Sequence, residues 1–168
     1  IRQEHDLVLT IDKNIQSFAE KELDYLLDKW RPTAGTIMVQ DPQTGAILAM
    51  AGSPSFDPNN YGQFPLGNFV NKAVQEAFEP GSSFKPITMS GAMDRKKVTP
   101  ETTYFDTGEV DIAGYKINNF NEKSFGTQTM SQVLEKSLNT GAMFAENQLG
   151  DDNFLNYVIN FGFGQVTG

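Results

Sequence analysis

The sequence contains no cysteine and a single histidine, His5. Without cysteine, these 168 residues cannot form a disulfide bond, a catalytic thiolate or a cysteine-ligated metal site. We assign His5 a structural or solvent-exposed role in a linker over residues 1–11, which leaves no histidine for a Ser-His-Asp triad. Nucleophilic catalysis in this chain must therefore rely on other side chains.

Positive charge is also scarce, with 13 lysine and arginine residues against 21 aspartate and glutamate residues. The formal net charge of −8 argues against nucleic acid as a partner and against docking on an anionic membrane surface, because both require a positive patch. No apolar run approaches the roughly 18 residues needed to cross a bilayer. The remaining composition, 39% hydrophobic and 20% charged, is typical of a globular domain with a real core.

The periodicity of the apolar residues predicts a mixture of helices and strands. It favours a helix over 12–30 with Asp12 as its N-cap, followed by two strands within 35–52 that are joined by a turn at 41–45. Both strands are almost continuously apolar, so we expect this hairpin to be covered on both faces. Further elements are expected at about 73–78 (helix), 105–115 (small hairpin), 129–136 and 140–149 (helices), with a final helix capped by Asp151.

The clearest chemical signal lies in the stretch EPGSSFKPIT, residues 79–88. Ser82 and Lys85 are three positions apart, so on a helix they share a face and the lysine amine can activate the serine hydroxyl as a base. Burial and the positive end of a helix both lower the pKa of a lysine and so favour that role. Pro86 has no N–H to donate, so we expect the helix to begin here with an irregular first turn.

A second polar motif, Ser137-Leu138-Asn139, is predicted in a corner between two helices, 55 positions after Ser82. Taken alone, the first motif favours a capped surface helix, and the second is equally compatible with a helix-ending turn that holds a left-handed asparagine. The two motifs together, in this order, favour a catalytic site. We interpret Glu76 and Glu79, which precede Ser82, as surface or helix-terminal charges.

The two motifs, quoted as EPGSSFKP and KSLNTGA, resemble those of the transpeptidase domain of penicillin-binding proteins. The resemblance extends along nearly the whole chain, through DLVLTIDKNIQ, VQDPQTGAILAMAGSPSFDPN and the closing FGFGQVTG, in the form typical of the monofunctional class B enzymes. It implies an α/β (α+β) fold of the β-lactamase/transpeptidase type, in which helices flank an antiparallel sheet that here lacks its C-terminal strands.

The resemblance also implies the chemistry. Ser82 would be acylated by the D-Ala-D-Ala end of a peptidoglycan stem peptide, with Lys85 as the base. Ser137 would relay the proton to the leaving amine, and Asn139 would hold the substrate amide and Lys85. A second stem peptide would then take the acyl group, whereas a β-lactam would acylate Ser82 and stay. No metal or organic cofactor is implied, and the parent protein would act at the extracytoplasmic face of the bacterial cell membrane.

Other functions remain open at this point. A serine β-lactamase or a D,D-carboxypeptidase uses the same two motifs, although we identify no additional base for deacylation by water. A β-lactam sensor or an inactive scaffold domain would keep the fold for partner binding.

The third motif of the family, a Lys-Thr-Gly or Lys-Ser-Gly strand, is absent from the 168 residues. In the family this strand lies C-terminal to the position that corresponds to residue 168. It supplies an oxyanion donor and a lysine that binds the substrate carboxylate. We therefore expect residues 12–168 to be the N-terminal part of a transpeptidase domain, with the missing C-terminal half as its partner. The chain alone is expected to be inactive towards the cell-wall substrate.

Overall fold

The structure, a computed structural model, describes residues 7–166, so His5 lies outside the described residues. The chain divides into two compact units, Ile1–Phe78 and Glu79–Gly168. Helices and antiparallel two-stranded sheets make up both units, so the α+β fold class is confirmed. Within residues 7–166, every helix is too short or too polar to cross a membrane.

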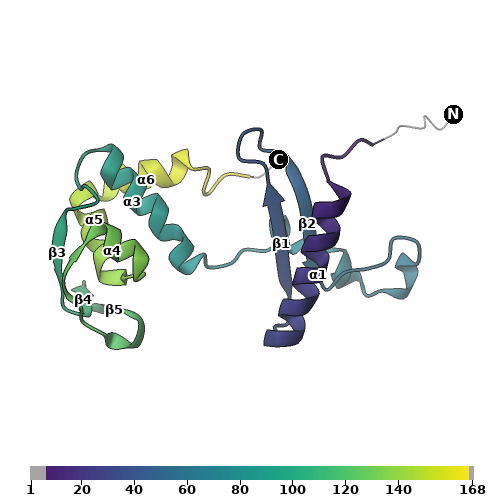
Figure 1. Cartoon of the computed structure of the whole chain (residues 1–168), viewed down its shortest axis with the longest axis horizontal. Helices are drawn as coiled ribbons and strands as arrows, with labels where there is room; N and C mark the ends of the chain where they lie inside the picture. The colour runs from purple at the N-terminus through teal and green to yellow at the C-terminus, as the bar shows by residue number, and fades with distance from the viewer. Residues whose placement is uncertain (1–6, 167–168) are drawn as a thin grey trace. The chain divides into compact units, whose positions relative to one another are not determined.

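The first unit consists mainly of a helix packed on a hairpin (Figure 1). Helix α1, Lys13–Trp30, begins after Asp12, whose side chain accepts hydrogen bonds from two amides of the first turn, as predicted. Strand β1, Gly35–Gln40, pairs in antiparallel fashion with β2, Ile47–Ser53. Small residues on both sides let the helix lie close to the hairpin; the buried core residues are Ala19, Leu23, Ala49 and Ala51.

One expectation for this unit was wrong, and the bounds of one predicted helix need correction. In the described unit the hairpin is not covered on both faces, because β1 alternates half-buried and exposed residues and Met38 is 41% exposed. The helix expected over 73–78 is the single turn α2, Lys72–Gln75, which ends where Glu76 returns to an extended backbone. Two 3₁₀ turns, Tyr61–Gln63 and Leu66–Phe69, precede it.

The second unit contains four helices and four short strands in its described part. The strands pair as two separate antiparallel sheets, β3 with β6 and β4 with β5. Their bounds are Thr103–Asp106 for β3, Glu109–Ile112 for β4, Tyr115–Asn118 for β5 and Gly126–Thr129 for β6. The helices are α3, Lys85–Asp94; α4, Met130–Glu135; α5, Asn139–Leu149; and α6, Asp151–Asn160.

These bounds refine the expected elements. The predicted small hairpin is real but lies three to four residues later, as β4–β5. Asp151 does not cap the last helix, because Gly150 holds the cap position and Asp151 is the first helical residue. An acidic residue in the first turn still complements the helix dipole.

Helices α3, α4 and α5 enclose the core of the second unit, which is lined by residues such as Met89, Ala92, Met130 and Ala145. Gly141 permits this close packing near the start of α5. A Cβ atom placed on Gly141 would lie 2.2 Å from a methyl group of Val133 and 2.8 Å from the hydroxyl of Tyr104. The first turn of α5 is thus pressed against α4 and β3.

Helix α4 ends in a Schellman motif whose left-handed residue is Ser137. The amide of Leu138 donates to the carbonyl of Val133 at 2.9 Å, and the amide of Ser137 donates to that of Leu134 at 3.2 Å. Ser137 has φ of 54°, a conformation in which glycine is the usual residue. The turn is closed by apolar packing, since Val133 and Leu138 are 0% and 1% exposed. The helix-ending turn expected here is present, but serine rather than asparagine is left-handed.

The left-handed backbone of Ser137 leads to a prediction about the stability of two variants. Ser137→Gly and Ser137→Ala both delete the hydroxyl, but only glycine adopts positive φ without a steric penalty. We expect Ser137→Gly to be more stable than Ser137→Ala by about 1 kcal/mol, measured by urea unfolding of the chain. At Asn147, exposed within α5, the same pair should show the reverse order by about 1 kcal/mol. An alanine variant at Ser137 as stable as the glycine variant would contradict the prediction.

Candidate active site

Ser82 lies in a tight turn that leads directly into α3. Residues Gly81–Phe84 form a 3₁₀ turn, and the amide of Lys85 donates to the carbonyl of Ser82. Pro86 falls in the first turn of α3, where its missing N–H leaves no helical hydrogen bond unmade. Gly81 has φ of 58°, which lets the chain bend sharply just before the serine. The irregular helix start predicted from Pro86 is confirmed.

Aromatic packing holds this turn in place. The ring of Phe84 meets the rings of Phe154 and Phe163 edge to face, with centroid separations of 6.2 and 4.9 Å. Helix α6 and the segment after it therefore anchor the turn from one side. Ser82 itself is exposed, so its hydroxyl is open to a substrate.

Lys85 is buried and contacts the Ser137 corner directly. Lys85 is only 9% exposed. Its Nζ donates to the carbonyl oxygen of Ser137 at 2.6 Å and to Oγ of Ser137 at 2.9 Å. Burial lowers the pKa of Lys85 below its ordinary value of 10.5 because the charged form loses hydration. A larger fraction of this amine is thus neutral at a given pH than in an exposed lysine.

The nucleophile and the lysine do not share a side-chain hydrogen bond. Within residues 7–166, no hydrogen bond joins the hydroxyl of Ser82 to Nζ of Lys85. The two residues are linked through the backbone of one turn, and the Lys85 amine is held by Ser137. Proton transfer from Ser82 to Lys85 therefore stays a prediction.

Asn139 is the first residue of α5, beside the Ser137 corner. Its Nδ2 donates to the carbonyl of Asn118, the last residue of β5, at 2.7 Å. In the described part of the chain its Oδ1 takes part in no hydrogen bond, and none joins Asn139 to Lys85. The amide oxygen is thus available to accept a hydrogen bond from a ligand.

The sequence did not single out two residues that support this corner, Asn119 and Asp106. The residue before α5 is Leu138, whose apolar side chain cannot accept a hydrogen bond from the first amides of the helix. Oδ1 of Asn119 takes that role, accepting from the amide of Asn139 at 2.8 Å and from that of Thr140 at 3.3 Å. An apolar residue at the cap position was the one available signal that an acceptor must come from elsewhere.

Asp106 is fully buried and anchors Asn119 in turn. Its Oδ1 accepts from Nδ2 of Asn119 at 2.9 Å, from Oγ1 of Thr140 at 2.7 Å and from the amide of Gly108 at 3.0 Å, while Oδ2 accepts from the amide of Phe125 at 2.9 Å. Burial by itself would raise the pKa of Asp106, but these hydrogen bonds together lower the pKa below 3.8. Asp106 is therefore a carboxylate at neutral pH.

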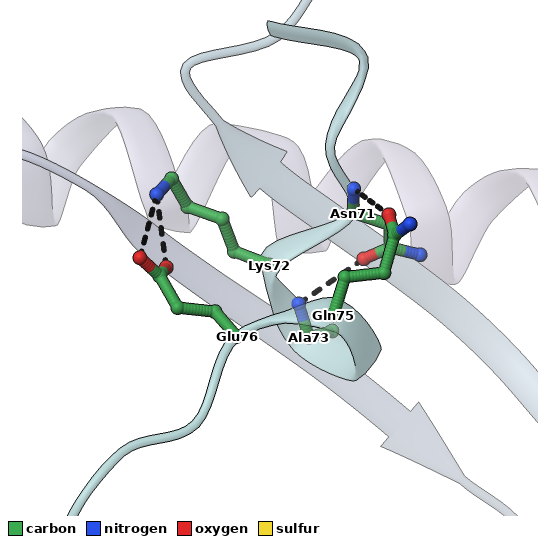
Figure 2. Close-up of polar contacts among 5 residues, drawn as sticks. All are labelled: Asn71, Lys72, Ala73, Gln75 and Glu76. Atoms are coloured by element: carbon green, nitrogen blue, oxygen red, sulfur yellow. Dashed lines mark hydrogen bonds and ion pairs between the residues drawn. The ribbon is translucent and has the colours of Figure 1, made fainter. Parts of the chain in front are cut away.

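The glutamates near the serine behave as surface charges, as expected. In the first unit, Glu76, the residue directly after α2, forms an ion pair with Lys72 at 2.9 Å (Figure 2). The same figure shows the Asn71 side chain accepting from the amide of Ala73 at the start of that turn. Glu79 is exposed. Within the second unit, Glu79 makes none of the side-chain contacts of Lys85.

The chain is similar to known cell-wall proteins along almost its full length. Residues 35–168 match the family described as "Penicillin binding protein transpeptidase domain". The chain is 33% identical over 165 residues to stage V sporulation protein D of Bacillus subtilis, covering 97% of this chain and 26% of that protein. It is 31% identical over 163 residues to the peptidoglycan D,D-transpeptidase FtsI of Escherichia coli, covering 97% of this chain and 27% of that protein.

A solved structure shares the fold. The crystal structure of a peptidoglycan glycosyltransferase from Burkholderia ambifaria superposes with a TM-score of 0.81 and 32% sequence identity, over 95% of this chain and 46% of that one. The chain spans about a quarter of the length of the two curated relatives described above. The family match covers most of the chain and agrees with the resemblance carried by the Ser82 and Ser137 motifs. The chain belongs to the family of penicillin-binding protein transpeptidase domains.

Proposed function

We propose that this chain carries the acylating centre of a serine D,D-transpeptidase that crosslinks peptidoglycan stem peptides. The observation that supports this most strongly is the contact of the Lys85 amine with Ser137, because it joins the two motifs around one buried base. The Ser82 hydroxyl lies one turn from that base and is exposed. No other described group near Ser82 combines burial with a basic nitrogen.

In the proposed reaction, Oγ of Ser82 attacks the carbonyl carbon between the two D-alanines while its proton passes to neutral Lys85. The C–N bond then breaks, and the departing D-alanine amine receives a proton from Lys85 through the hydroxyl of Ser137. The amine of a second stem peptide attacks the acyl-enzyme, loses a proton along the same route and releases Ser82. The 2.9 Å contact between Nζ of Lys85 and Oγ of Ser137 is the geometry such a relay requires.

Asn139 is proposed to bind the substrate backbone through its free Oδ1, which suits an amide N–H of the stem peptide or of a β-lactam side chain. The amide of Ser82 is a candidate donor for the oxyanion. We place this activity at the extracytoplasmic face of the bacterial membrane, where the stem peptides lie.

A complete site also needs a second oxyanion donor and a cation for the substrate carboxylate. In this family a Lys-Thr-Gly or Lys-Ser-Gly strand would supply both, and the 168 residues contain neither sequence. We therefore propose that residues 12–168 work together with a C-terminal part that carries this strand. The assays below use the chain alone and the chain joined to, or mixed with, such a part.

The first test is labelling of Ser82 by a fluorescent penicillin. We expect labelling only when the Lys-Thr/Ser-Gly strand is supplied, and we expect Ser82→Ala to abolish it. Ser83→Ala is the matched control, because the adjacent Ser83 hydroxyl already donates its hydrogen to the carbonyl of Pro80, at 2.8 Å. Mass spectrometry of the labelled peptide identifies the modified serine.

Three outcomes would count against the proposal. Labelling that persists in Ser82→Ala would exclude this nucleophile. Strong labelling of the chain alone would contradict the need for the additional strand. An adduct that is hydrolysed within minutes would indicate a β-lactamase in place of a transpeptidase.

A second test follows from the lowered pKa of Lys85. The base form is neutral, so the labelling rate should rise with pH and level off with a midpoint below 10.5. Lys85→Arg keeps the positive charge at every accessible pH, so it should lower the rate about 100- to 10,000-fold and remove the rise. The rate is measured with the Lys-Thr/Ser-Gly strand supplied, by quenching the labelling reaction at successive times at a fixed penicillin concentration across the pH range. A pH-independent rate in the unmodified chain would show that Lys85 is not the base.

A further inference from the structure

We propose that Asn119 is a positioning residue of the active site: from the segment after β5 it caps α5, and it thereby holds Ser137 against Lys85 and keeps Asn139 in place beside that corner. The effect of Asn119 on catalysis rests on the proposed function, whereas the contacts that Asn119 makes do not depend on it. Asn119 lies 20 positions before Asn139 and is 4% exposed, so it is part of the folded interior and inaccessible to substrate.

The helix that carries Asn139 has no acceptor of its own at its start. Four amides at a helix N-terminus lack intrahelical partners, and the side chain of the preceding residue, Leu138, contributes only packing. One oxygen of Asn119 accepts from the amides of both Asn139 and Thr140. A side chain from a distant segment therefore performs the function that a Ser, Thr, Asp or Asn usually performs locally.

Because Asn119 caps α5, position 138 can hold an apolar residue. A local cap at position 138 would need a polar side chain, whereas Leu138 packs into the core and closes the Schellman turn that makes Ser137 left-handed. The left-handed turn is also what offers both the carbonyl and the hydroxyl of Ser137 to Lys85. Strained conformations of this kind persist where the surroundings over-determine them.

Asn119 is itself held rigidly. Its Nδ2 donates to Asp106 and, at 3.2 Å, to the carbonyl of Lys123, while its own amide donates to the carbonyl of Gly108 at 2.9 Å. Thr140 closes the network by donating to the same carboxylate. Every partner of Asp106 is a donor, so the orientation of the Asn119 amide is set: nitrogen to Asp106, oxygen to α5.

The key experiment compares Asn119→Ala with the unmodified chain in two measurements. The first is the titration of Lys85, followed by the ¹³Cε shift of labelled lysine in the 168-residue chain and assigned through Lys85→Arg. If the corner moves away from Lys85, the amine regains hydration and its midpoint rises towards 10.5. The second, made with the Lys-Thr/Ser-Gly strand supplied to both chains, is the labelling rate of Ser82 by fluorescent penicillin. This rate should fall about 10- to 100-fold, because a displacement of about 1 Å suffices for such a loss.

Two control variants separate positioning from general loss of stability. Leu149→Ala opens a cavity at the opposite end of α5, where Leu149 is 2% exposed, and destabilises the same helix without touching the corner. Asn147→Ala makes the same chemical change at an exposed site on α5. Both folded control variants should retain the Lys85 midpoint and the labelling rate of the unmodified chain.

Asn119→Asp should replace asparagine only at low pH, where its carboxyl group is protonated. A protonated carboxyl at position 119 mimics asparagine, since its O–H can donate to Asp106 while its carbonyl accepts from α5; an ionised one instead faces the Asp106 carboxylate. The ratio of its labelling rate to that of the unmodified chain should therefore fall between pH 5 and 8. In the unmodified chain, the titratable side chains that contact this network are Asp106, whose pKa lies below 3.8, and Tyr104, whose pKa burial raises above 10.0. Neither changes charge between pH 5 and 8 there, so a fall of the ratio reports the carboxyl pair that the variant creates.

The outcomes distinguish this inference from the proposed function. A folded Asn119→Ala chain with an unchanged Lys85 midpoint overturns the positioning role, and so does an unchanged labelling rate. If the unmodified chain is never labelled, even with the added strand, the proposed function fails, and the Lys85 titration still decides the inference. If Asn119→Ala does not fold, Asn119→Asp decides it: a labelling ratio that stays constant from pH 5 to 8 overturns it.

Discussion

The contact between Lys85 and Ser137 is the interaction on which the arrangement of this site depends. It joins the first turn of α3 to the corner between α4 and α5, two segments 52 positions apart in the sequence. Burying an amine is unfavourable for its charged form, and two acceptors from a single residue offset only part of that cost. The same burial that opposes folding with a charged lysine lowers its pKa, which is the property a base in this position needs.

Local departures from ideal structure concentrate at that corner. Ser137 is left-handed although it is not glycine, and Leu138 occupies a cap position although it cannot cap. Asp106 is a fully buried carboxylate. Each feature is unfavourable alone and is compensated by a specific interaction. The Schellman turn holds Ser137, the Asn119 oxygen caps the helix in place of Leu138, and four hydrogen-bond donors satisfy Asp106. Such clusters of locally unfavourable choices are typical of functional sites, where the whole structure supports what local propensity does not.

The sequence predicted the local elements well where a strong pattern meets a clear boundary signal. Helix α1 begins after Asp12, the hairpin turn lies at 41–45, and the proline after Lys85 marks an irregular helix start. It failed where the answer depended on distant neighbours. The burial of β1 reflects which other elements lie on it, and the cap of α6 depends on Gly150 adopting a positive φ that leaves Asp151 inside the helix.

By itself, the sequence determined which reactive residues the chain contains and in what order. They are a serine, a lysine three positions later and a Ser-x-Asn motif, and their order resembles that of one family. Spacing of three residues is enough to bring Ser82 and Lys85 to neighbouring positions, because helical geometry is local. Only the tertiary structure decided that Lys85 is held by Ser137 and that Asn119, not a neighbour in sequence, supports Asn139. These contacts join side chains 20 and 52 positions apart, and no local periodicity encodes them, since they arise from how the helices and hairpins pack.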